Sequence, residues 1–134
     1  MKKVLVDSSV WVAFFRGQET PETDILDYLL EEGLVCTTGL IMAEIIPSAR
    51  TVKEFRLLQE HFQALPCLGD PPSMWPNIIE WQYKLKRKGI HGIGIADLIV
   101  AIVANEHDSA ILTSDKHFKL AEQVMGLELV RSKE

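Results

Sequence analysis

Residues 2–15 of the chain, KKVLVDSSVWVAFF, decide its fold class. The first part is a short β-branched run that ends at Asp7, as expected of a buried strand in a parallel sheet. The part after Asp7 has the length and apolar content of a helix, and Ser8 or Ser9 would cap its start. A strand that leads directly into a helix is the repeating unit of an α/β fold.

The rest of the chain repeats this alternation of strands and helices. Further strands are predicted at residues 34–38, 65–69, 109–115 and 127–130. Helices are predicted within residues 21–33, 39–49, 51–65, 75–89, 89–108 (after a glycine-rich loop) and 116–125. There is no internal repeat and no linker, so residues 1–134 are expected to form one domain. The prediction is a three-layer α/β/α fold with a central parallel sheet of about four to five strands.

Composition and charge exclude several classes of function. The longest apolar run, residues 93–104, is too short for a bilayer, which needs about 20 residues. Asp7 interrupts the apolar start of the chain, which argues against an export signal. Cys36 and Cys67 form no C-x-x-C motif and no disulfide framework. We therefore expect a cytoplasmic protein with no membrane partner. Its net charge of −5 argues against nucleic-acid binding through charge alone.

Four acidic residues stand in positions that call for an explanation. Asp7 and Asp115 each follow a predicted strand, where ligand sites of parallel sheets form. Asp97 and Glu44 are each the only charge in an apolar run, GIADLIVAIVA (residues 94–104) and GLIMAEIIP (residues 39–47). The ordinary alternatives are that the strand-end acids cap helices, that Asp97 accepts from free N–H groups of its own helix, and that Glu44 pairs with a buried base. No base lies within one helical turn of Glu44 or Asp97, which favours one shared site.

A divalent cation would explain such a cluster. Carboxylates that are brought together repel one another and raise one another's pKa, and a bound cation removes that repulsion. Oxygen ligands suit Mg²⁺ or Mn²⁺. Zinc would favour His or Cys, and the four histidines show no H-x-x-x-H spacing. The chemistry that fits is metal-assisted hydrolysis of a phosphodiester bond.

Together these motifs resemble the PIN-domain nucleases, and most closely the small toxins of VapBC toxin–antitoxin pairs. The motifs are VLVDSSVWVAFF (residues 4–15), the lone Glu44, GIGIADLIVAIVA (residues 92–104) and ILTSDKHF (residues 111–118). The resemblance implies an endoribonuclease that depends on Mg²⁺ or Mn²⁺, forms a homodimer and is inhibited by a cognate antitoxin. It implies four catalytic and metal-binding carboxylates: Asp7, Glu44, Asp97 and Asp115. It also implies supporting hydroxyls at Ser8 and Thr113.

The basic cluster KLKRK (residues 84–88) and the loop GIHGIG (residues 89–94) precede Asp97. One hypothesis is that Arg87, Lys88 and His91 contact RNA phosphates; the alternatives are a solvated helix face and a flexible loop.

Three other functions stay open at this point: a PIN nuclease of RNA processing, a PIN-like domain that does not cleave, and a receiver-like regulatory domain. The receiver is disfavoured because Asp7 is followed by two serines and not by a second acid.

Overall fold

A computed structural model describes residues 2–131 as a four-stranded parallel sheet with helices on both faces. The order of the strands in the sheet is β3-β2-β1-β4. The strands are β1 (Val4–Val6), β2 (Val35–Thr38), β3 (Cys67–Leu68) and β4 (Ala110–Leu112). The predicted α/β class with a parallel central sheet is confirmed.

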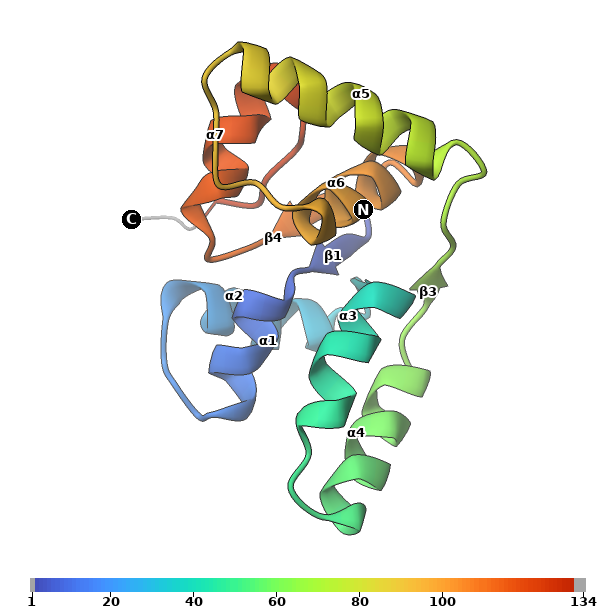
Figure 1. The fold of residues 1–134 in the computed structure, drawn as a ribbon. Helices are drawn as coiled ribbons and strands as arrows, with labels where there is room; N and C mark the ends of the chain where they lie inside the picture. Colours follow the sequence, from blue (N-terminus) through green and yellow to red (C-terminus); the bar gives the residue numbers. More distant parts are fainter. Residues whose placement is uncertain (1, 132–134) are drawn as a thin grey trace.

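The connections between strands place the helices in two layers. Parallel strands are joined by right-handed crossovers, so connections that run in opposite directions along the sheet cover opposite faces. Figure 1 shows α5, α6 and α7 above the sheet and the earlier helices below it. The helices are α1 (Ser8–Phe15), α2 (Pro21–Glu31), α3 (Gly39–Ile45), the 3₁₀ helix η1 (Ile46–Ser48), α4 (Val52–Gln63), α5 (Met74–Arg87), α6 (Ile95–Glu106) and α7 (Lys116–Met125).

The chain reverses its direction across the sheet between β1 and β4. From β1 it proceeds outward to β2 and β3, and then returns to place β4 on the other side of β1. The carboxyl ends of β1 and β4 therefore lie side by side while their following helices diverge. Ligand sites of open parallel sheets form at such a switch point.

The core is built around α6 and the first helix. Leu98 and Val103 of α6 are fully buried, as its apolar sequence predicts. Trp11 of α1 is also fully buried and packs edge-on against Phe62 of α4, with ring centroids 5.0 Å apart. These contacts fix the helices on each side of the sheet and hold the residues that precede them at its edge. Within residues 2–131, every helix is too short or too polar to cross a bilayer.

Three sequence predictions need correction. The strand predicted at residues 127–130 is a single bridge between Leu129 and Ile111, because β4 is only three residues long and offers little edge to pair with. The helix predicted within residues 51–65 is present, but the apolar residues of α4 are buried in its C-terminal half only, at Leu58 and Phe62. Val52 is 68% exposed, since α4 projects beyond the sheet in Figure 1. The N-cap of α1 is Asp7 and neither serine, because both serines already lie inside the helix.

Candidate active site

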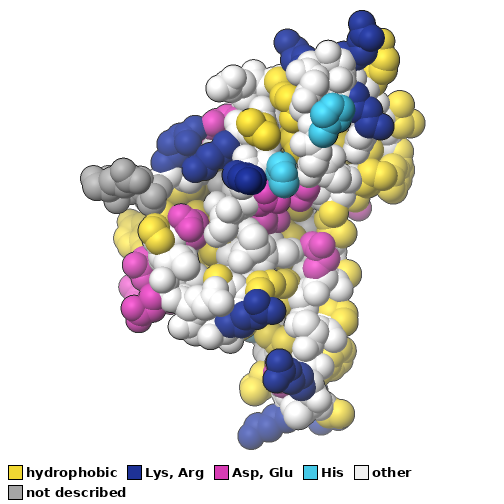
Figure 2. Space-filling model, turned by 60° about the vertical axis from the view of Figure 1, so that its left-hand side comes forward, with side chains coloured by type: hydrophobic (Ala, Val, Ile, Leu, Met, Phe, Trp, Pro, Cys, Tyr) yellow, Lys and Arg dark blue, Asp and Glu magenta, His cyan; other side chains and the backbone are white. Residues whose placement is uncertain are grey.

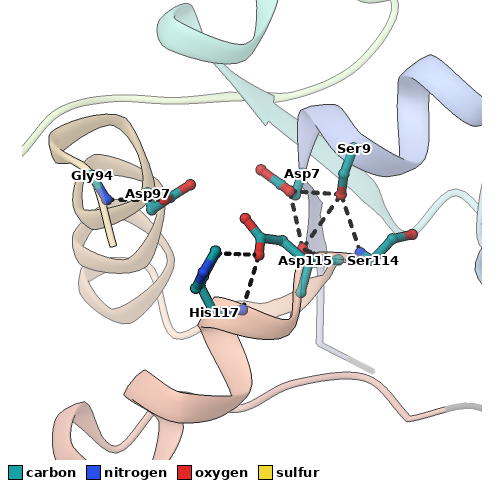
Figure 3. A network of polar contacts seen from close by, with 8 residues as sticks. Asp7, Ser9, Gly94, Asp97, Ser114, Asp115 and His117 are labelled. Carbon is teal, nitrogen blue, oxygen red and sulfur yellow. Dashed lines mark hydrogen bonds and ion pairs between the residues drawn. The ribbon is translucent and has the colours of Figure 1, made fainter. Parts of the chain in front are cut away.

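Asp7 leaves the end of β1 as a buried carboxylate held by two hydroxyl groups. Its side chain is only 8% exposed. Ser9 donates to Oδ2 of Asp7 at 2.8 Å, and Thr113 donates to the same oxygen at 3.0 Å. Ser9 comes from the first turn of α1 and Thr113 from the end of β4, so the two segments of the switch point grip one carboxylate oxygen (Figure 3).

Asp115 stands at the N-terminus of α7, three residues after β4. Its Oδ1 accepts from the backbone N–H of His117 at 2.9 Å and lies 2.9 Å from Nδ1 of the same histidine. The backbone N–H of Asp115 donates to the Thr113 hydroxyl, which in turn donates to Asp7. Asp115 therefore does cap a helix, which was the ordinary alternative for a strand-end acid. The capping bond uses only one of the two carboxylate oxygens of Asp115.

Asp97 faces these two residues from the first turn of α6. Its Oδ2 accepts from the backbone N–H of Gly94 at 3.1 Å. Burial raises the pKa of Asp97 above its usual range. The Gly94 amide lowers this pKa in part, the charges of Asp115 and Asp7 raise it further, and nearby His117 lowers it. The carboxylates of Asp7 and Asp115 thus act on the pKa of Asp97, although the three residues come from separate segments of the chain.

Glu44 lies at the margin of this group. It is exposed on α3 and accepts from Ser8 at 2.7 Å through Oε1. The buried base considered as its partner is absent among residues 2–131, where Glu44 forms no ion pair. Ser8, the residue after Asp7, thus holds Glu44 near the site, while Ser9 supports Asp7 itself.

The donor set suits a hard cation. In the part of the chain that the structure describes, Oδ1 of Asp7, Oδ1 of Asp97 and Oδ2 of Asp115 accept no hydrogen bond. Figure 3 shows the three carboxylates directed toward a common space. Residues 2–131 contain no ready-made group of three His, Cys, Asp or Glu ligands, so binding a cation requires the carboxylates to move closer together. Oxygen-only donors fit Mg²⁺ or Mn²⁺.

Sequence reasoning missed three residues of this network. Ser9 also accepts from the backbone N–H of Ser114 at 3.1 Å, and His117 makes the double contact with Asp115. Their only signal in the sequence is that each lies within two residues of a strand-end aspartate.

The three basic residues expected to contact phosphates are exposed. Arg87 and Lys88 end α5, and His91 lies in the loop before α6. The same loop touches the site at Gly92, where an added Cβ would stand 2.8 Å from Nε2 of His117.

Comparison with known proteins identifies the family of the chain. The model of the PIN domain family matches residues 4–123. The chain is similar to Ribonuclease VapC21 of Mycobacterium tuberculosis, with 33% identity over 119 residues, 87% of this chain and 84% of that protein. It is also similar to Ribonuclease VapC2 of M. tuberculosis, with 30% identity over 132 residues, 95% of this chain and 90% of that protein.

Solved structures match the fold over nearly the whole chain. VapBC2 from Rickettsia felis, bound to a DNA fragment from its promoter, matches with a TM-score of 0.74 at 16% identity and covers 97% of this chain and 98% of that one. VapBC-1 from nontypeable Haemophilus influenzae matches with a TM-score of 0.72 at 16% identity and covers 95% and 96%. The chain thus belongs to the PIN-domain family and, within it, to the VapC ribonucleases.

Proposed function

We propose that this chain is the endoribonuclease of a toxin–antitoxin pair and hydrolyses RNA phosphodiester bonds with Mg²⁺ or Mn²⁺. One observation carries the proposal: Asp7, Asp97 and Asp115 face one another at the switch point of the sheet. Within residues 2–131, one carboxylate oxygen of each accepts no hydrogen bond. The relatives named ribonucleases support RNA as the substrate. Residues 1–134 act as one catalytic domain.

In this proposal the three aspartates hold the cation through their free oxygens. When bound, the cation lowers the pKa of a water ligand and stabilises negative charge on the phosphate. Ser9 and Thr113 fix the orientation of the Asp7 carboxylate, because both hydroxyls donate to one oxygen and leave the other available. His117 does the same for Asp115.

A bound cation would favour the ionised form of Asp97. Its pKa is raised by burial and by like charges, so without a cation the proton is held more tightly than in an exposed aspartate. Glu44, with one oxygen bonded to Ser8, is placed to act on the outer side of the site through water.

The relatives and the surface support two protein partners. Solved structures of similar fold are VapBC complexes, which supports a cognate antitoxin. Trp75, Ile79 and Tyr83 form an exposed apolar stripe at i, i+4 and i+8 on α5, which favours a homodimer. We place the protein in the cytoplasm, in line with its two free cysteines.

Incubation of purified protein with total RNA, with Mn²⁺ or with excess chelator, tests the proposal. We expect cleavage only with the metal, and none in Asp7→Asn or Asp97→Asn. Asp27→Asn is a matched control, because Asp27 is an exposed aspartate of α2. Full cleavage in chelator or in either site variant would overturn the mechanism. Growth that continues under strong expression would overturn the toxin assignment alone.

A further inference from the structure

A basic cavity adjoins the aspartates on the side of α7. Its volume is about 340 Å³. Thr113 and Ser114 form the wall that it shares with the active site, since these residues also bond Asp7 and Ser9. The full lining is Glu22, Thr113, Ser114, Lys116, Lys119, Leu129, Val130 and Arg131.

The charge of the cavity is opposite to that of the chain. Three cationic side chains and one carboxylate line it, whereas the whole protein has a net charge of −5. Arg131 forms an ion pair with Glu122, with 2.5 Å between Nη2 and Oε1. Lys116 and Lys119 are exposed and, among residues 2–131, form no ion pair. They are three residues apart on α7 and therefore share one face of the helix.

The position of the cavity suits a polyanion that must reach the aspartates. Three carboxylates repel a phosphate chain, so the substrate needs cations close to the site to hold it there. Figure 2 shows Lys and Arg side chains gathered beside the acidic side chains on this face of the molecule. The hydroxyls of Thr113 and Ser114 mark the boundary between the acidic and the basic part.

We propose that this cavity binds a backbone phosphate of the RNA, next to the phosphate that is cleaved, through Lys116 and Lys119. This inference rests on the proposed function, since it takes RNA as the substrate. It assigns the basic side of the RNA path to α7, separately from the Arg87 and Lys88 group at the end of α5. The lysines hold and position the substrate and take no part in bond cleavage.

The test is the salt dependence of single-stranded RNA binding, measured by fluorescence anisotropy in an Asp7→Asn background that cannot cleave. Each lost phosphate contact lowers the slope of log K against log salt by about 0.7, and the cavity holds one phosphate, so Lys116→Gln/Lys119→Gln is expected to flatten the slope by about 0.7. If the curves converge near 1 M salt, this corresponds to about 5-fold weaker binding at 0.1 M. Lys116→Arg/Lys119→Arg should restore the slope, because charge and not lysine itself is required.

Lys53→Gln/Arg56→Gln is the matched control. These exposed residues have the same i, i+3 spacing on α4, far from the cavity, and should leave the slope unchanged. An unchanged slope in the α7 variant, or equal loss in both variants, overturns the subsite. Cleavage by the wild type with Mn²⁺ is measured in parallel, so the proposed ribonuclease function stands or fails on a separate result.

Discussion

Replacement of Gly92 by alanine tests the contact between the loop before α6 and the histidine that holds Asp115. Gly92 has a φ of +94°, a backbone conformation that costs an L residue about 1–2 kcal/mol. An added Cβ would also stand 2.8 Å from Nε2 and 3.0 Å from Cδ2 of His117. The ring can move away only by giving up the contact between Nδ1 and Asp115, worth about 1 kcal/mol net at this half-buried position.

The expected loss of unfolding free energy for Gly92→Ala is therefore about 2–3 kcal/mol. Gly89→Ala provides the matched control. Gly89 lies in the same loop with a φ of +74°, and a Cβ added there meets nothing within 4 Å. Its expected loss is only the conformational part, about 1–2 kcal/mol. Each kcal/mol should lower Tm by about 4 °C in a domain of this size.

Urea unfolding of a double-mutant cycle separates the two contributions. His117→Ala removes the ring that Gly92→Ala would strike, so the combined variant should recover about 1 kcal/mol relative to additivity. The same His117→Ala change should leave the loss in Gly89→Ala unaltered. If Gly92→Ala costs no more than Gly89→Ala, or if His117→Ala recovers nothing, the loop does not rest on the histidine.

Three further predictions concern stability and reactivity. The raised pKa of Asp97 means that the folded state binds its proton more tightly than the unfolded chain. The resulting stability is fully present below the ordinary pKa of 3.8 and is lost as pH rises through the folded value. Asp97→Asn should therefore melt above wild type at pH 7 in chelator, with the gap in Tm closing as pH falls toward 3.8. Burial raises the pKa of the Cys36 thiol to about 11, so a thiol reagent at pH 8 should modify exposed Cys67 alone until the protein unfolds. Trp11→Ala should lower the unfolding free energy by about 3–5 kcal/mol in urea titrations, because Trp11 is fully buried.

Much of the frame of the site could be predicted from the sequence. A β-branched run that ends at Asp7 and is followed by a helix is typical of a strand that leads into a helix in an α/β fold. The segment that ends at Asp115 has the same pattern. The apolar run around Asp97 predicted a buried helix, and α6 is buried. These predictions succeed because they depend on periodicity and on the order of elements, which local sequence encodes.

The partners of the carboxylates could not be predicted in the same way. Ser8 was the hydroxyl expected to support Asp7, whereas Ser9 donates to Asp7 and Ser8 donates to Glu44. Successive residues of a helix point about 100° apart, so a difference of one position directs a hydroxyl to another neighbour. Which of the two meets β4 depends on the rotation of α1 on the sheet, and that is fixed by tertiary packing around Trp11.

The basic cavity depends even more on tertiary structure. The cluster KLKRK (residues 84–88) was predicted to contact RNA phosphates because its charges are adjacent in the sequence. Adjacent residues of a helix, however, point in different directions. Lys116 and Lys119 are isolated in the sequence, yet they share a cavity with Arg131 because the chain turns back after α7. The cavity then meets the aspartates through Thr113, whose hydroxyl donates to Asp7. For a substrate that carries one charge per nucleotide, the relevant quantity is the density of positive charge in space beside the cleaved bond. The salt dependence of binding can therefore test each basic group: loss of a phosphate contact flattens it, and loss of a solvated lysine does not.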